Sequence, residues 1–186
     1  MALITVDEAK DYLGLSGDTY NTLLTTLVDV ATADLEREAG RHLATYARTE
    51  VLNGTGHELL WLAEPAESVT SVHMDSDQEW DDDSLEDSGD YLVDGCRIEK
   101  LDGVWSKAQR NVQVIYKAGY TTPTADLKHA AKIQTAYLYS RRAQAQKALD
   151  VVASHNVEGW SETFKAVVDV HPSAARIVKR YRPERL

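Results

Sequence analysis

One stretch decides the fold class: 111-NVQVIYKAGYTTPTADLKHAA-131, which changes from strand to helix character within a few residues. Its first part, Asn111 to Lys117, alternates apolar with polar side chains and is rich in β-branched residues, which predicts a strand. Pro123 lies beyond the end of that strand. Asp126 then opens a long helix that we expect to extend to about Val152. The fold therefore needs both a sheet and long helices.

Upstream, helical patterns occupy the first forty residues. Thr5 and Glu8 have the spacing of a capping box, which predicts a short helix from Val6 to Leu13. A longer helix is expected from Thr19 to Ala39, with Asp18 as its N-cap. Its apolar stripe is too pronounced for an isolated helix, so it must pack on other elements.

Between the helical parts, short β-rich segments alternate with turns. A hairpin is expected around Asn53-Gly54-Thr55-Gly56, with strands near 49–52 and 59–62. A further strand is expected at Ser68 to Met74, and a second hairpin at 91–101. The expected fold class is α+β, with long helices packed with a small, mainly antiparallel β region.

The C-terminal end is expected to form an arm. We assign residues 1–153 to a helical and β core that includes an acidic insertion at 75–90, and residues 154–186 to the extended arm. Pro172 suits the first turn of a short terminal helix over Ser173 to Tyr181.

Composition limits the class of protein. The 186 residues are 43% apolar and 27% charged, which is typical of a globular domain rather than a disordered chain. No run of eighteen apolar residues occurs, and no basic and apolar leader opens the chain, so neither a membrane span nor a signal peptide is expected. Cys96 is the only cysteine, so an internal disulfide is impossible and synthesis in a reducing cytoplasm is expected. We expect its thiol to be buried and inert.

The net charge of −10 is unevenly distributed. Residues 1–125 carry 9 basic and 24 acidic residues, whereas residues 126–186 carry 11 basic and 6 acidic residues. This asymmetry indicates polar assembly or two different partners, unless both faces are simply solvated. The basic residues of the C-terminal cluster could contact nucleic acid or an acidic protein: Arg176, Lys179, Arg180, Arg182 and Arg185.

The acidic insertion, 75-DSDQEWDDDSLEDSGD-90, contains nine acidic residues and no basic ones. It could be a metal cage, a catalytic pair, a disordered spacer or a surface that repels an anion. Four of its carboxylates stand at positions 1, 3, 5 and 12 of an EF-hand-like loop, where calcium ligands belong: Asp75, Asp77, Glu79 and Glu86. Trp80 occupies position 6, which requires glycine, and a strand precedes the segment instead of a helix. A calcium-dependent acidic binding module is therefore the alternative function.

No set of side chains or motif in the sequence predicts an enzyme. A solvated acidic loop gives its carboxyl groups similar environments, which does not suit glycoside hydrolysis. None of the six histidines forms an i, i+4 pair, so zinc lacks ligands. The glycines at 53–56 lack the lysine of a phosphate loop, and no GxSxG motif occurs. We expect no catalytic residue and no cofactor.

Taken in order, the motifs resemble one protein family. The chain opens with LITVDEAKDYLGL, its long helix ends in AGR, and SVTSV, YLVDG, NVQVIYKAGY and ADLKHAAK follow. HPSAARIVKRYRPERL completes the order. This order is similar to that of the head–tail connector, or head-completion adaptor, proteins of long-tailed bacteriophages. The resemblance covers nearly the whole chain, although the acidic insertion is longer and more charged than the family pattern.

The resemblance implies a structural virion protein of the head–tail junction, without catalysis. Such adaptors form a ring of about twelve subunits beneath the portal protein. The ring extends the DNA channel, through which the genome passes without sequence readout. It also offers a platform to a tail-side connector (stopper) or another tail component. Outside the ring the chain could be a monomer.

The resemblance also implies that the C-terminal segment, about Pro172–Leu186, docks on the portal. We expect an apolar anchor from Ile177, Val178 and Tyr181, with partner carboxylates paired to Arg176, Lys179, Arg180 and Arg182. A helix this short could order only upon docking. Acidic side chains facing the DNA channel would repel phosphate, and the candidates are Asp81, Asp82, Asp83, Glu86 and Asp87. The insertion could equally lie outside the ring or face the tail component.

Overall fold

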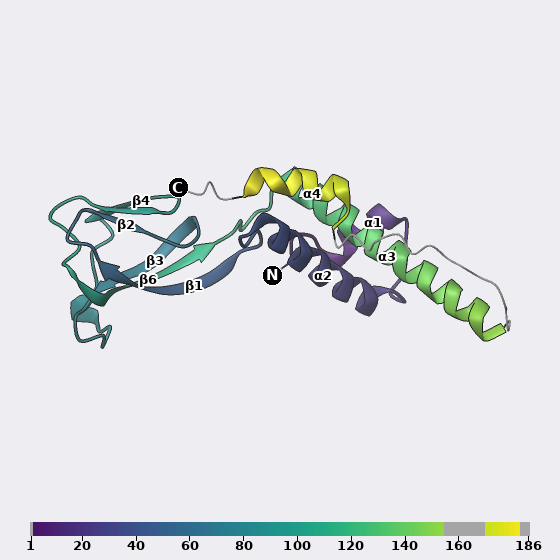
Figure 1. Ribbon diagram of the computed structural model, residues 1–186, viewed down its shortest axis with the longest axis horizontal. Helices are drawn as coiled ribbons and strands as arrows, with labels where there is room; N and C mark the ends of the chain where they lie inside the picture. The colour runs from purple at the N-terminus through teal and green to yellow at the C-terminus, as the bar shows by residue number, and fades with distance from the viewer. Residues whose placement is uncertain (1, 155–169, 183–186) are drawn as a thin grey trace. The chain divides into compact units, whose positions relative to one another are not determined.

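The computed structural model describes residues 2–154 and 170–182. Its elements divide into two units, drawn in Figure 1. The helical unit contains the described residues of 1–40 and 123–186, and the β unit contains residues 41–122. Helices combined with antiparallel sheets confirm the predicted α+β class. The expected boundary between core and arm at residue 153 stays a prediction, because residues 155–169 lie outside the described part.

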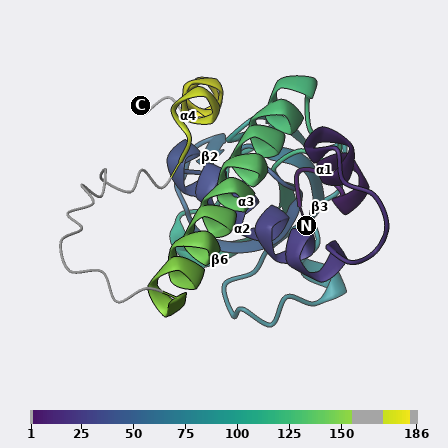
Figure 2. The same cartoon turned by 90° about the vertical axis from the view of Figure 1, so that its right-hand side faces the viewer.

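The helical unit is built around two long helices. Its elements are α1 (Val6–Leu13), α2 (Asn21–Ala39), α3 (Ala125–Ser154), α4 (Pro172–Val178) and the 3-10 turn η2 (Lys179–Tyr181). Helices α1, α2 and α4 all pack against α3, which crosses in front of α2 in Figure 2. Buried residues recur along α2 at the spacing of one helix face, which confirms the predicted stripe: Leu24, Val28, Ala31 and Leu35.

Of the two helix N-termini predicted from capping residues, one is confirmed and one is wrong. The predicted capping box is present: the Thr5 hydroxyl accepts from the Glu8 amide at 3.1 Å, and the Glu8 carboxylate accepts from the Thr5 amide at 2.9 Å. The predicted N-cap at Asp18 is wrong. A turn lies between Asp18 and Asn21, and α2 begins only after Tyr20, without a side-chain cap. Asp18 instead accepts a hydrogen bond from the side-chain amide of Asn21.

The β unit contains two three-stranded antiparallel sheets. The long sheet has the order β1 (Tyr46–Gly54), β6 (Ala108–Ala118), β3 (Ala66–Met74). The short sheet has the order β2 (Leu59–Trp61), β5 (Arg97–Lys100), β4 (Tyr91–Asp94). The predicted hairpin of β4 and β5 is confirmed.

The hairpin predicted around residues 53–56 is wrong. Strand β1 pairs with β6 and strand β2 pairs with β5, so this turn connects two sheets instead of two neighbouring strands. The Gly54 amide donates to Oδ1 of Asn111 at 2.7 Å, and a Cβ atom at Gly54 would lie 1.9 Å from the Ser106 carbonyl oxygen. The chain therefore turns here against the start of β6, a long-range contact that local turn residues do not encode.

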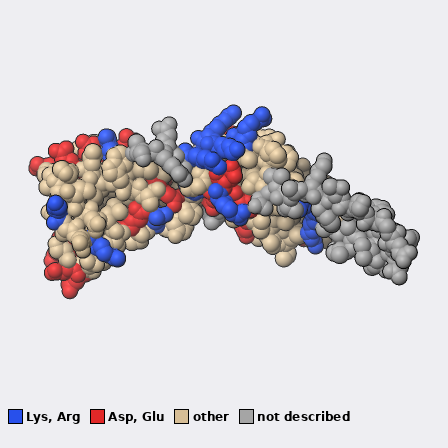
Figure 3. All heavy atoms as spheres, in the orientation of Figure 1, with Lys and Arg blue, Asp and Glu red and all other residues tan. Residues whose placement is uncertain are grey.

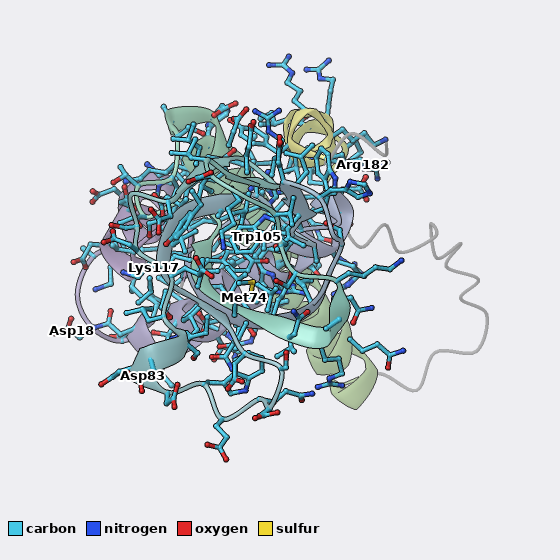
Figure 4. All side chains as sticks on the ribbon, turned by 90° about the vertical axis from the view of Figure 1, so that its left-hand side faces the viewer. Asp18, Met74, Asp83, Trp105, Lys117 and Arg182 are labelled. Atoms are coloured by element: carbon cyan, nitrogen blue, oxygen red, sulfur yellow. The ribbon has the colours of Figure 1, made fainter. Side chains whose placement is uncertain are left out.

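The inner faces of the two sheets share one core. The long sheet contributes Val72, Val112, Val114, Tyr116 and Ala118, and the short sheet contributes Leu60, Tyr91 and Ile98. Trp105 is fully buried between the sheets, and its indole N–H donates to the Glu58 carbonyl at 2.8 Å. Figure 4 shows Trp105 among the strands. The β unit is thus a small sandwich.

Candidate interaction surfaces

The C-terminal helix α4 packs on its own chain. Pro172 is its first residue, as predicted, and His171 precedes it as N-cap. Ala174 and Val178 are fully buried against the other helices, and Ile177 is half-buried. Residues four positions apart lie on one face of a helix, so one side of α4 completes the core of the helical unit.

Polar contacts hold this segment at both ends. At its start, the His171 amide donates to Oε1 of the buried Gln134 at 2.9 Å. At its end, the Tyr181 hydroxyl donates to Asp126 at 2.6 Å, and the Arg182 guanidinium lies 2.8 Å from a Glu38 carboxylate oxygen. These contacts secure the segment without any partner.

The expected apolar anchor stays a prediction, although two of its three residues also make contacts within their own unit. Val178 is fully buried in its own unit, and the hydroxyl of Tyr181 is bonded to Asp126. Ile177 and Tyr181 are both half-buried, so each keeps part of its surface accessible. The expectation that this helix orders only upon docking is wrong, because intramolecular burial already stabilises it.

The opposite side of the segment is basic. Arg176, Lys179 and Arg180 are exposed and spaced so that they share one helical face. Figure 3 shows Lys and Arg side chains gathered over α4. None of the three forms an ion pair with a described residue, whereas Arg182, predicted to act with them, is paired with Glu38. We call Arg176, Lys179 and Arg180 the basic face.

The acidic insertion lies in the β unit, which holds most of the negative charge. Residues 41–122 contain 16 acidic and 7 basic residues, for a net charge of −9. The insertion passes beside β3, since the Glu86 amide donates to the Val72 carbonyl at 2.8 Å. It includes a short 3-10 turn, η1 (Asp82–Ser84), and Asp83 points outward at the margin of Figure 4.

The five predicted channel-lining residues are not equivalent. Asp81, Asp82, Asp83 and Asp87 are exposed. Glu86 is half-buried and forms an ion pair with Lys100, whose Nζ lies 3.0 Å from both carboxylate oxygens. The charge of Glu86 is thereby neutralised, so four residues remain as candidates.

The four predicted calcium ligands do not converge. Both oxygens of Asp75 accept backbone amides, those of Asp77 and Glu79 at 2.8 Å and that of Trp80 at 3.1 Å. These hydrogen bonds lower the pKa of the Asp75 carboxyl. Glu86 is paired with Lys100. In the described residues, no three His, Cys, Asp or Glu side chains are grouped so that they could hold a metal ion.

One polar cluster escaped sequence reasoning. In the β unit, Arg48 lies 2.6 Å from Glu50 and 2.7 Å from Glu64, and His42 lies 2.9 Å from Glu64. Burial acts to raise the pKa of Glu64, but the bonds from His42 and the charge of Arg48 outweigh it and lower this pKa. Glu50 stands at an inward position of β1, opposite Val114. Strand alternation could have identified it as a buried carboxylate that needs partners within the unit.

Cys96 has the environment of an unreactive thiol. It is half-buried after the end of β4. Burial raises the pKa of its thiol, which disfavours the nucleophilic thiolate.

Comparison with known proteins decides the family. Residues 2–183 match the profile of the head completion protein family. The chain belongs to the head completion protein family. This membership confirms the resemblance drawn from the order of the motifs. It makes the chain a structural component of the head–tail connection in phage-like virions.

The fold of this head completion protein has also been seen in an assembled particle. A chain from the neck of an empty GTA particle, computed with C6 symmetry, shares 18% sequence identity and a TM-score of 0.65. The alignment covers 99% of this chain and 91% of the other, and at this identity it establishes the fold alone. No curated protein matches the chain in sequence. Among its described helices, none is long and apolar enough to span a membrane.

Proposed function

We propose that this head completion protein is a ring-forming adaptor that docks beneath the portal protein. In this role it extends the DNA channel and carries the next connector or a tail component, in virions assembled in the cytoplasm of a bacterial host. The family match over residues 2–183 is the observation that carries the proposal. The similar chain comes from a neck computed with C6 symmetry, which supports a rotationally symmetric ring, here of about twelve copies.

The basic face is the proposed portal contact. Arg176, Lys179 and Arg180 project from a helix whose other side is fixed in the core, so they are presented without a large entropic cost. Facing partner carboxylates, such charges increase the association rate and select the partner more than they add affinity. Ile177 supplies a small apolar contribution beside them.

Charge reversal tests this contact. A variant with Arg176→Glu, Lys179→Glu and Arg180→Glu should bind portal at least about tenfold more weakly, since like charges at an interface cost several kcal/mol. A matched control reverses three exposed basic residues elsewhere: Lys107→Glu, Arg110→Glu and Arg142→Glu. Truncation is unsuitable because it removes Ala174 and Val178 from the core. Equal portal affinity of the two triple variants would show that the basic face is not the contact.

The exposed carboxylates of the insertion are the proposed lining of the channel. A ring repeats Asp81, Asp82, Asp83 and Asp87 in every subunit, which produces a dense negative belt. Phosphate dominates non-specific DNA binding, so such a belt repels DNA and lets it slide. Neighbouring subunits also repel one another, and salt relieves this.

Neutralisation tests the lining. Replacing all four aspartates by asparagine in assembled particles should slow DNA ejection or change DNA retention. A control replaces Glu58 by glutamine and Asp102 by asparagine, two exposed acidic residues of the same unit outside the insertion. If particles with the fourfold variant eject and retain DNA normally, the insertion does not line the channel. The proposed portal contact would be unaffected by that result.

A further inference from the structure

A pocket opens on the surface of the helical unit, where side chains of α1, α3 and α4 come together. Figure 2 shows α3 running between α1 and α4. The pocket has a volume of about 400 Å³, within the range of about 300–1,000 Å³ that is typical of ligand sites. Seven side chains line it, and we call it the aromatic pocket: Tyr12, Ile133, Ala136, Tyr137, Ser140, His171 and Ser173.

Two aromatic rings of the pocket are held in place by their own unit. The rings of Tyr137 and His171 meet edge-on, with their centroids 5.5 Å apart. Nδ1 of His171 accepts the Ser173 amide at 3.3 Å, and the His171 amide donates to Oε1 of Gln134 at 2.9 Å. Because these contacts fix both rings before any partner binds, filling the pocket costs little ordering entropy.

The lining favours an uncharged, aromatic occupant. None of the seven lining residues is Asp, Glu, Lys or Arg, and Ile133 and Ala136 contribute aliphatic surface. The Tyr12 side chain is 46% exposed. Tyrosines are enriched among the residues that dominate binding energy at protein interfaces. Aromatic rings also gain energy when they pack edge-on or offset against one another, so a further ring suits this pocket.

The pocket is continuous with the basic face. Ser173, Ile177 and Arg180 follow one another at spacings of four and three residues, which places them on one side of the C-terminal segment. The side of α4 that lines the pocket therefore leads to Arg180 of the basic face. One extended partner segment can reach both.

Basic side chains dominate the surroundings of the pocket. Besides the basic face, the Arg141 guanidinium lies 5.6 Å from the centre of the Tyr137 ring. On the α1 side, the Glu8 carboxylate is paired with Lys128 at 3.0 Å, and Asp11 adds one exposed negative charge. The surroundings are thus net positive, which favours an occupant flanked by carboxylates.

We propose that the aromatic pocket binds an aromatic side chain of the portal protein, carried by an acidic segment that also contacts the basic face. This inference rests on the proposed portal contact and names the apolar anchor that accompanies its charges. The two parts of the surface have different tasks. The basic face speeds association and selects the partner. The buried ring supplies affinity by slowing dissociation.

Filling the pocket in the full chain tests the inference. Ser140→Trp places a large ring at an exposed position of the lining and should weaken binding to purified portal at least about tenfold. Ser140→Ala removes the same hydrogen bond, from the Ser140 hydroxyl to the Tyr137 carbonyl, but leaves the pocket open. Gln144→Trp adds the same ring one turn further along α3, outside the lining. Both controls should bind portal like the wild type.

Measurements without portal identify any other occupant. Free Ser140→Trp should unfold at the same temperature as the two controls and sediment as the wild type does. A lower unfolding temperature would show that the chain fills the pocket itself, and altered self-association would show that a second copy fills it. Either result overturns the inference, as does equal portal affinity of Ser140→Trp and the wild type. If charge reversal of the basic face still weakens binding in those cases, the proposed function stands. A wild-type chain that does not bind portal counts against the proposed function instead.

Discussion

The hydroxyl of Tyr181 donates a 2.6 Å hydrogen bond to Oδ1 of Asp126, which lies 55 residues earlier in the chain. The Thr124 hydroxyl at 2.5 Å and the Leu127 amide at 3.0 Å donate to the same oxygen. The first turn of α3 is thereby tied to the 3-10 turn that follows α4. This connection determines how firmly the basic face is held, because Arg180 immediately precedes Tyr181.

Removing the hydroxyl should loosen this connection. Tyr181→Phe deletes one donor to a carboxylate and should lower the free energy of unfolding by about 1 kcal/mol. Urea denaturation followed by circular dichroism measures the change. Tyr20→Phe is the matched control, because the Tyr20 ring makes an edge contact with Tyr139 that phenylalanine preserves. A loss of equal size in the control would show that Tyr181 acts through ring packing instead.

The same contact predicts a pH dependence of stability. The hydrogen bonds from Thr124 and Tyr181 lower the pKa of Asp126 in the folded protein. A carboxyl with a lowered folded pKa stabilises the fold fully above its unfolded pKa of about 4, and this stabilisation is lost as the pH falls through the folded pKa. The difference in unfolding free energy between wild type and Tyr181→Phe should therefore narrow from pH 7 to about pH 3. A difference that widens in acid would contradict this assignment.

Local signals were enough for several elements. The capping box of Thr5 and Glu8, the strand around Val114 and the helix that begins near Asp126 each depend on neighbours in sequence. Periodicity and capping express backbone preferences over one or two turns, so they can be predicted from the chain alone. The order of such motifs was also sufficient for the family resemblance.

Long-range contacts were not predictable in this way. The turn at 53–56 has the composition of a hairpin, yet β1 finds its partner in β6, more than fifty residues later. Similarly, the local sequence of the C-terminal segment does not distinguish a helix that folds only on a partner from one that packs on its own chain. Burial of Val178 decides that question, and it depends on helices distant in sequence.

Gly119 should tolerate no side chain. Its φ is +82°, and a Cβ atom would lie 2.2 Å from the Ala44 carbonyl oxygen, where the chain runs beside Tyr120. Gly119→Ala should lower the unfolding free energy by about 3 kcal/mol, through backbone strain and overpacking together. Gly103→Ala isolates the strain, because its φ is +85° with no atom within 4 Å of the added Cβ. Gly103→Ala should lower the unfolding free energy by only about 1 kcal/mol. If the two variants lost equal unfolding free energy, the clash with Ala44 would be ruled out.

Gln134 should contribute strongly to the stability of the helical unit. Its side-chain amide donates to Asp34 at 3.0 Å and accepts from the His171 amide at 2.9 Å, and the residue is fully buried. Gln134→Leu leaves the Asp34 carboxylate and the His171 amide without these hydrogen bonds. It should lower the free energy of unfolding by about 2–3 kcal/mol. Gln144→Leu, at an exposed position of the same helix, should change stability little. Amide exchange of His171 should accelerate in Gln134→Leu alone. Unchanged exchange there would show that Gln134 does not secure the start of α4.

The acidic insertion should not bind calcium at a dedicated site, because its best-placed carboxylate is already occupied. Asp75 accepts the amides of Asp77, Glu79 and Trp80, and Trp80 has a φ of +56° within this turn. Calorimetry with millimolar calcium should therefore show no saturable heat, and Asp75→Asn should accelerate amide exchange at the three donors. Asp77→Asn is the control, since the exposed Asp77 contributes its backbone and not its side chain. A one-site calcium isotherm that disappears in Asp75→Asn would contradict this prediction. It would mean that the Asp75 carboxylate exchanges its backbone donors for the metal ion. The calcium-dependent alternative function would then be correct.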